Sequence, residues 1–150
     1  MAPKEPMTLY YRTSLYGPEE SENTSLQRQD YSDINRTTTN FTASKYMCTS
    51  DFKTPTTDII HVSGVRLPSS NNLPSTFSET ITITSKPYQR GNVSNMVVAT
   101  ATYVDSGSGQ FTASNKINYA VTAASGKFEG YKNMQIIYDK DKIRRTVILS

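Results

Sequence analysis

The sequence has little of the chemistry on which most enzymes and metal proteins depend. Its 150 residues include one cysteine, Cys48, one histidine, His61, and no tryptophan. A single cysteine excludes an intramolecular disulfide and a cysteine-based zinc site. A single histidine excludes a multi-histidine metal site. The sequence therefore predicts no metal and no cofactor, and we interpret Cys48 and His61 as structural residues.

Long apolar runs and a dense charge of one sign are also missing. No run approaches the roughly 18 apolar residues that a membrane-spanning helix needs, and the opening MAPKEPMTLYY lacks the hydrophobic region of a cleavable signal peptide. The formal net charge is +3, and two aspartates dilute the densest basic cluster, DKDKIRR at 139–145. This pattern disfavours nucleic acid as a partner. We expect an intracellular or virion location.

Residues that suit β-strands are abundant. Ten tyrosines accompany many Val, Ile and Thr residues, whose side chains fit a pleated, half-buried surface. The segment 76–85 alternates most regularly, with Phe77, Ile81 and Ile83 on one face and threonines on the other. Gly64 marks a possible bulge. Eight segments are expected as strands: 8–16, 44–53, 57–67, 76–85, 95–104, 111–121, 133–139 and 142–150.

These segments predict an all-β fold, a small antiparallel barrel of about eight strands, because closure removes exposed strand edges. A β-sandwich or jelly roll is the alternative. The length suits a single domain spanning residues 1–150. An N-terminal arm of about residues 1–7 and a long polar loop of about residues 17–43 are expected outside the strands. Connections of that length are often functional, so we predict that arm and loop grip adjacent subunits.

The stretch VTAASGKFEG at 121–130 carries a resemblance to a known family. Thr122, Ser125, Gly126, Phe128 and Gly130 match the TGGSG-x-F-x-G turn of the allene oxide cyclase and dirigent barrels. The likeness covers roughly residues 96–150. It implies a barrel whose lumen holds an apolar molecule, such as an oxidised fatty acid or a phenolic, without any metal.

The chain also departs from that family. Ala123 and Ala124 replace two glycines, and alanine resists positive φ, so the turn is expected to follow a less demanding backbone path. Asn133 falls where a further turn glycine usually lies, and we expect Asn to replace it in a left-handed conformation. The family's catalytic members carry an acidic residue on or near the first strand, whereas TLYYRTSLYG has none. This difference speaks against cyclase-type catalysis.

Glu79 is the candidate catalytic residue. It shares a strand face with Phe77 and Ile81, so it could point into the barrel and act there as an acid or base. The favoured interpretation is a solvated carboxylate at the barrel mouth. Arg145 shares a face with Val147 and is either an internal partner for Glu79 or, as we favour, a rim residue with its stem packed.

Five residues are candidates for contacts with other proteins. Tyr31 and Tyr131 lie in polar segments, and tyrosine is enriched at interfaces. Lys140, Lys142 and Arg144 form the basic cluster near the end of the chain.

The absence of a recognisable set of catalytic residues favours a non-enzymatic structural protein. We predict a β-barrel subunit held in a large assembly by protein subunits, for example a minor capsid or cementing component of a virus particle. The alternative is a cyclase- or isomerase-like barrel, or a carrier, that binds an apolar small molecule, with Glu79 as the internal acid. The two hypotheses differ in the lumen: a structural barrel fills it with side chains, whereas a ligand barrel keeps a cavity of roughly 300 Å³ or more.

Overall fold

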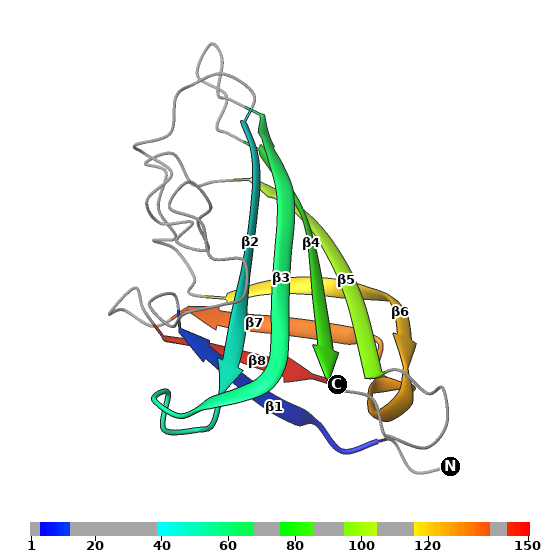
Figure 1. Ribbon diagram of the computed structural model, residues 1–150. Helices are drawn as coiled ribbons and strands as arrows, with labels where there is room; N and C mark the ends of the chain where they lie inside the picture. The colour runs from blue at the N-terminus through cyan, green and yellow to red at the C-terminus, as the bar shows by residue number, and fades with distance from the viewer. Residues whose placement is uncertain (1–3, 13–38, 68–75, 86–94, 105–115, 139–143) are drawn as a thin grey trace.

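The computed structural model describes residues 4–12, 39–67, 76–85, 95–104, 116–138 and 144–150. Within them, eight antiparallel strands form one closed barrel, in which each strand pairs with the next and the last pairs with the first (Figure 1). The predicted barrel is confirmed. The sandwich or jelly-roll alternative is wrong, because β1 pairs with β8 along its whole length and closes the sheet. The strands are β1 (Met7–Arg12), β2 (Thr39–Cys48), β3 (Pro55–Leu67), β4 (Thr76–Ser85), β5 (Asn95–Val104), β6 (Lys116–Ser125), β7 (Asn133–Tyr138) and β8 (Arg144–Leu149).

Side chains alternate between the interior of the barrel and its outer face. On β4, Phe77, Ile81 and Ile83 are fully buried, whereas Ser78 and Thr84 are exposed. Corresponding residues of the other strands complete a single core, and burial of this apolar surface is the main stabilising term. These residues include Tyr11, Met47, Ile60, Val62, Val97, Ala99, Ile117, Met134, Ile136, Val147 and Leu149.

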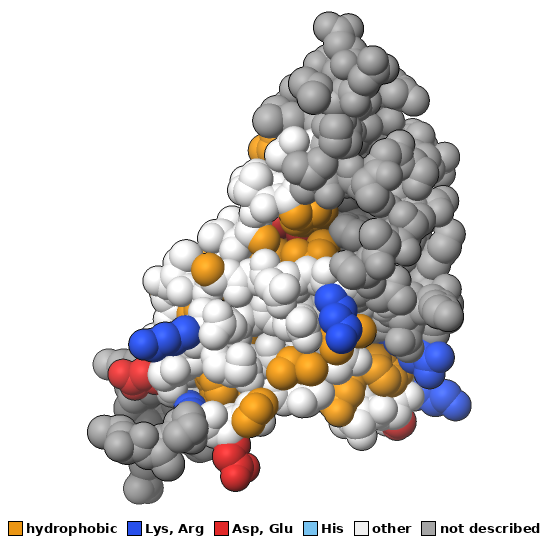
Figure 2. All heavy atoms as spheres, turned by 180° about the vertical axis from the view of Figure 1, so that it is seen from behind, with side chains coloured by type: hydrophobic (Ala, Val, Ile, Leu, Met, Phe, Trp, Pro, Cys, Tyr) orange, Lys and Arg blue, Asp and Glu red, His pale blue; other side chains and the backbone are white. Residues whose placement is uncertain are grey.

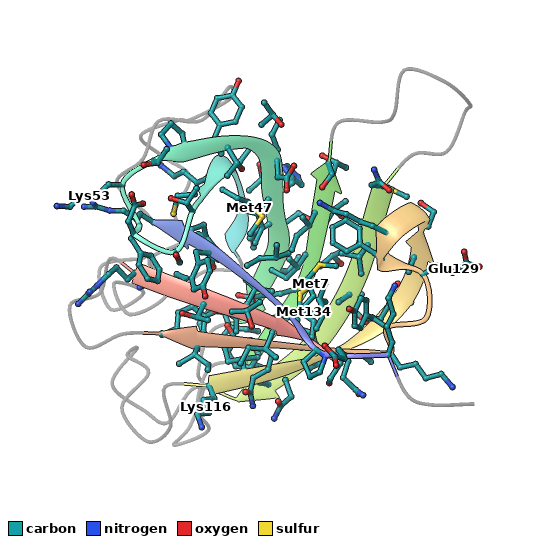
Figure 3. All side chains as sticks on the ribbon, turned by 90° about the horizontal axis from the view of Figure 1, so that it is seen from below. Met7, Met47, Lys53, Lys116, Glu129 and Met134 are labelled. Carbon is teal, nitrogen blue, oxygen red and sulfur yellow. The ribbon has the colours of Figure 1, made fainter. Side chains whose placement is uncertain are left out.

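The lower part of the barrel is filled with side chains. Figure 1 shows β2 to β5 running steeply along the molecule, while β1, β6, β7 and β8 cross its lower part. Seen from below, Met7, Met47 and Met134 lie inside the ring of strands (Figure 3). Phe128, in the short 3₁₀ helix η2 (Gly126–Phe128), is fully buried and belongs to the same core.

Strand register is regular over most of the sheet. The pairing shifts between Tyr46 and Cys48 on β2 and between Val98 and Ala99 on β5. The bulge predicted at Gly64 is wrong, since that residue pairs in register with both β2 and β4. A glycine inside a strand can also mark a place where another group approaches the backbone closely.

Several predicted boundaries differ from the observed ones. The predicted polar loop of about 17–43 is wrong at its end, because β2 already begins at Thr39; residues 13–38 lie outside the described part. The strand predicted at 44–53 ends at Cys48. A turn follows, in which the Asp51 carboxylate accepts hydrogen bonds from the Thr49 and Thr54 hydroxyls and from the Lys53 and Thr54 amides. These donors hold the pKa of Asp51 well below its usual range.

The described part of the N-terminal arm packs on its own chain. The Lys4 ammonium donates hydrogen bonds to the carbonyls of Lys127 and Glu129, both at 2.8 Å. It also lies 4.4 Å from the centre of the Tyr131 ring, and the Tyr131 hydroxyl donates to the carbonyl of Glu5 at 2.7 Å. Residues 4–6 are thus fastened across the β6–β7 connection.

Candidate functional site in the barrel lumen

The buried carboxylate of Glu79 is the centre of the candidate site. Only 2% of Glu79 is exposed, and it faces the lumen from β4 between Phe77 and Ile81. Its cross-strand neighbours are Gly64 on β3 and Ala101 on β5. Because neither neighbour has a large side chain, the space beside the carboxylate is open to side chains from other positions in the barrel.

Two tyrosines supply those groups. The Tyr119 hydroxyl, from β6, donates to Oε1 of Glu79 at 2.6 Å, and the Tyr103 hydroxyl, from β5, donates to Oε2 at 2.8 Å. The Tyr103 ring stacks on Phe77 with centroids 5.3 Å apart. Hydrogen bonds to an ionised acceptor are about twice as strong as neutral ones, so these phenols offset part of the cost of burying the carboxylate.

The polar groups continue across the lumen to β8. The hydroxyls of Tyr119 and Tyr138 are 3.4 Å apart, and the Arg145 guanidinium lies 4.9 Å from the centre of the Tyr138 ring. Arg145 is fully buried, and its Nη1 donates to the carbonyl of Arg144 at 3.0 Å. An acid and a guanidinium are therefore both held inside the barrel and connected through tyrosines.

Tyr11 adds a further buried hydroxyl to this group of side chains. It pairs with Arg145 across the β1–β8 ladder and is fully buried. Its hydroxyl has no hydrogen-bond partner among the described residues. Leaving a buried polar group unsatisfied costs about 1–3 kcal/mol, so an acceptor at this position would be stabilising. We call Tyr11, Glu79, Tyr103, Tyr119, Tyr138 and Arg145 the lumen cluster.

The back of the molecule has a hollow in its surface (Figure 2). Figure 2 shows an acidic side chain at the bottom of a hollow rimmed by hydrophobic side chains. Among the described acidic residues, only Glu79 is buried. Apolar walls with a few convergent polar groups are typical of small-molecule sites.

Lys45 is a second buried cation in the barrel. It pairs with Ile60 on β3, which pairs with Ile83 on β4, so it belongs to an inward-facing row. Only 6% of Lys45 is exposed, and desolvation by this burial lowers its pKa.

The sequence placed Glu79 and Arg145 on the lumen face, but the favoured interpretations of both are wrong. Glu79 is not a solvated carboxylate at the mouth, and Arg145 is not a rim residue. The donors for Glu79 come from neighbouring strands, and alternation within β4 gives no information about them. Sequence reasoning also missed all four tyrosines of the cluster as site residues, although each shares a strand face with apolar residues: Tyr11, Tyr103, Tyr119 and Tyr138.

The glycines of the family-like turn behave as predicted. Gly126 has φ 62° and Gly130 has φ 97°, so both use the left-handed region that glycine tolerates best. Phe128 between them is buried. The stretch therefore turns β6 into β7, as expected.

Other parts of the turn prediction are corrected. Asn133 does not adopt a left-handed conformation; it is the first residue of β7, and its amide and carbonyl bond Ser150. Thr122 and Ser125 lie within β6, and Ala123 and Ala124 pair with β5, so the small residues extend the strand. The turn proper starts only at Gly126.

Two of the five interface candidates are described. Tyr131, predicted as an interface candidate, is only 5% exposed, and its ring and hydroxyl hold the N-terminal arm of the same chain. Arg144 is exposed, and its guanidinium lies 5.8 Å from the centre of the Phe52 ring. Tyr31, Lys140 and Lys142 lie outside the described residues.

His61 and Cys48 contact neighbouring strands. His61 pairs with Ser44 on the outer face, where Nδ1 of His61 lies 2.6 Å from the serine hydroxyl. Cys48 is 4% exposed. Burial, with the nearby negative charge of Asp51, raises the pKa of its thiol to about 11, against an opposing effect of Arg12. The thiol is therefore protonated at neutral pH, as befits a packed residue.

An outer groove of about 570 Å³ lies where β2 and β4 end and β3 begins. Tyr46, Ile59 and Thr84 form one cross-strand row of its lining. None of its lining residues belongs to the lumen cluster, although Ser85 has the same strand phase as the buried Ile83.

No protein-family model, curated protein or solved structure matches this chain. In the described ranges, no helix has the length and apolar character to cross a membrane. The same residues contain no group of three or more His, Cys, Asp or Glu side chains placed to hold a metal ion. The function is therefore inferred from the geometry of the lumen.

Proposed function

We propose that the barrel binds an apolar small molecule bearing one or two oxygen or nitrogen groups, which its lumen cluster recognises. The observation that carries this proposal is the Glu79 carboxylate, 2% exposed and held by two tyrosine hydroxyls inside a barrel with apolar walls. An ionised carboxylate accepts more than two hydrogen bonds, so a ligand N–H or O–H can join the tyrosines.

Energetics supports binding over a purely structural role for the lumen. Replacing buried ionic groups with packed apolar residues of similar volume is often neutral or stabilises by about 1–4 kcal/mol. A barrel that served only as a scaffold would therefore gain little from Glu79 and the fully buried Arg145. The Tyr11 hydroxyl, which has no hydrogen-bond partner among the described residues, points the same way, since it offers a donor on the residue that pairs with Arg145.

A lumen that holds an apolar molecule is also what the resemblance to the allene oxide cyclase and dirigent barrels implies. We include that relationship in the proposal, with binding as the function and without a cyclase reaction. An oxidised fatty acid and a phenolic compound both combine an apolar body with oxygen groups that suit Glu79 and Tyr11.

The test is a fluorescence titration with 1-aminoanthracene, an apolar probe with an amine donor, displaced by decan-1-ol. The wild-type protein should bind the probe saturably, and Glu79→Gln should weaken binding by about tenfold or more, because a hydrogen bond to a charged group is worth about 1.5–3 kcal/mol. Ser78→Ala, on the exposed outer face of the same strand, is the matched control and should bind as wild type. Absence of saturable binding to the wild type would refute the proposal.

The outer groove favours a second candidate function, that of a subunit in a larger assembly. Its cross-strand row of Tyr46 and Ile59 combines an aromatic and an aliphatic side chain on the barrel surface, and tyrosine is enriched at interfaces. The mass of the native particle from its source, by sedimentation before any dissociation, tests this candidate. A large complex containing the chain at fixed stoichiometry would support it, and a free monomer would refute it.

A further inference from the structure

We propose that the outer groove is a second small-molecule site, which binds an uncharged aromatic alcohol through the Ser85 hydroxyl and the Tyr46 ring. The groove has a volume of about 570 Å³ and lies where β2 and β4 end and β3 begins, in the lower part of the molecule (Figure 1). The inference goes beyond the proposed function, because the groove is outside the lumen cluster and its ligand needs nothing bound there. A small molecule in the groove is also an alternative to another subunit in the same place.

The groove forms because β3 continues past the end of its ladder with β4. Within the described residues, that ladder ends with the pair of Ile59 and Thr84, and β3 extends beyond it to Pro55. Ile59 also pairs with Tyr46 on β2, so one row of side chains crosses all three strands. This row and the extension of β3, residues 55–57, line the groove together with Ser85.

The Ser85 hydroxyl is a polar group of the groove with unused hydrogen-bonding capacity. Only 8% of Ser85 is exposed, and its Oγ has no hydrogen-bond partner among the described residues. Its cross-strand partner Asn95 instead accepts a hydrogen bond from the Lys127 amide at 2.8 Å. By contrast, the Thr56 hydroxyl in the same groove donates to the carbonyl of Met47 at 3.2 Å. Because the large majority of buried polar side-chain atoms are hydrogen-bonded, Ser85 indicates a partner from outside the chain.

This hydroxyl can turn to meet a ligand. A serine side chain has three staggered χ1 rotamers, and rotation of Ser85 breaks no hydrogen bond to the described residues. Ser85 is the last residue of β4, at the wall of the groove. Because a serine hydroxyl both donates and accepts, it can pair with a ligand hydroxyl in either direction.

The other lining residues select an uncharged, aromatic ligand. None of the described residues that line the groove is charged, so an ion bound there would lose its hydration without gaining a counter-charge. The Tyr46 ring is half-buried and lies beside Ile59 in the cross-strand row. Aromatic rings favour offset-stacked or edge-to-face contact with a second ring. A neutral ring that carries a hydroxyl satisfies both Tyr46 and Ser85.

Size favours a small molecule over a protein partner. The volume of about 570 Å³ falls within the range of about 300–1,000 Å³ that is typical of ligand pockets. A stable protein interface uses about 20–30 residues from each side, whereas seven described residues line the groove. The groove by itself is therefore large enough for a ligand and too small for a subunit interface.

The groove and the lumen cluster are distinct along β4. Ser85 lies six residues from Glu79, which is about 20 Å at 3.2–3.4 Å per residue. The fully buried side chains of Ile81 and Ile83 lie between them. Ligands at the two places are therefore measured separately.

An NMR titration of the isotope-labelled full chain with 2-naphthol tests the inference, because the shifts are assigned residue by residue. This probe is uncharged at pH 7 and joins an aromatic ring to one hydroxyl. The amides of Ile59 and Thr84 should shift saturably on titration. Ser85→Ala should raise the Kd read from these amides by about fivefold, the effect of one neutral hydrogen bond.

Two controls isolate the hydroxyl. Ser78→Ala makes the same change on the exposed face of β4 and should leave the Kd as in the wild type. Naphthalene lacks the hydroxyl and should bind the wild type and Ser85→Ala equally. An equal Kd of 2-naphthol for the wild type and Ser85→Ala would overturn the inference, as would the absence of saturable shifts at Ile59 and Thr84.

Folding stability separates a ligand-binding role of Ser85 from a structural one. Ser85→Ala removes a hydroxyl that bonds none of the described residues, so the urea midpoint of the ligand-free protein should not fall. A clear fall would show that the hydroxyl already has a partner in the chain, and the inference would be wrong.

The position of the shifts distinguishes this site from the lumen. Shifts confined to amides near the lumen cluster, such as Phe77 and Tyr119, and lost in Glu79→Gln would overturn the groove site and leave the proposed function standing. Groove shifts that Glu79→Gln leaves unchanged would support the site even if the lumen binds nothing. Shifts of the groove amides on dilution of the ligand-free protein would assign the groove to a second copy of the chain and overturn the inference.

Discussion

Removal of the Tyr119 hydroxyl is the sharpest probe of how the lumen cluster is held. Tyr119→Phe deletes the 2.6 Å hydrogen bond to Oε1 of Glu79 and leaves the ring in place. A hydrogen bond to a charged group contributes about 1.5–3 kcal/mol, and removing one partner from a buried pair carries the desolvation cost of the other. We therefore expect the free energy of unfolding to fall by about 2 kcal/mol.

Tyr103→Phe is the comparison within the same cluster. Its hydroxyl donates to the other carboxylate oxygen at 2.8 Å, and Tyr103 is only half-buried. Water can replace part of this hydrogen bond, so the expected loss is smaller, about 1 kcal/mol.

The assay is urea unfolding at pH 7, followed by far-UV circular dichroism. The midpoint should fall while the slope with urea stays constant, since neither variant changes the area exposed on unfolding. A double-mutant cycle with Glu79→Gln should give a coupling energy of about 1 kcal/mol between positions 79 and 119. A loss below about 0.5 kcal/mol for Tyr119→Phe, the range of ordinary surface substitutions, would refute the reasoning.

Three further predictions concern residues that do not belong to the lumen cluster. Gly130→Ala should destabilise the protein by about 1–3 kcal/mol in urea unfolding, because the backbone φ of Gly130 is 97°. Steric contact is not the cause, since the added Cβ would meet only Lys4 Cδ at 3.7 Å. An unchanged urea midpoint would contradict this prediction. Lys4→Met should speed proteolysis of the N-terminal arm, since it removes two hydrogen bonds and a contact with the Tyr131 ring, and it should leave probe binding unchanged. Equal cleavage rates for wild type and Lys4→Met would argue against the attachment of the arm. The difference in free energy of unfolding between wild type and Asp51→Asn should be present at pH 7 and shrink below about pH 4, the pKa of an aspartate in the unfolded state. The reason is that the folded-state pKa of Asp51 is depressed. A difference that stays constant down to pH 2 would contradict this prediction.

Much of the architecture was predictable from local pattern. The segment 76–85 alternates so regularly that its strand and its lumen face follow from the residues alone, and the same holds for the bounds of β5. Gly126 and Gly130 marked the β6–β7 turn correctly, because only glycine adopts positive φ without strain. The prediction at Asn133 failed because β7 begins there and pairs with Ser150, a contact distant in sequence.

The sequence by itself determined that the chain is all-β, that its strands are numerous enough for a barrel, and that Glu79 and Arg145 share the face of apolar residues. Only the tertiary structure decided what those two charges do. Whether a carboxylate on a strand is solvated or buried depends on donors from other strands, here Tyr103 and Tyr119. Such donors are brought together only by strand register and barrel closure, which the periodicity of one strand does not encode.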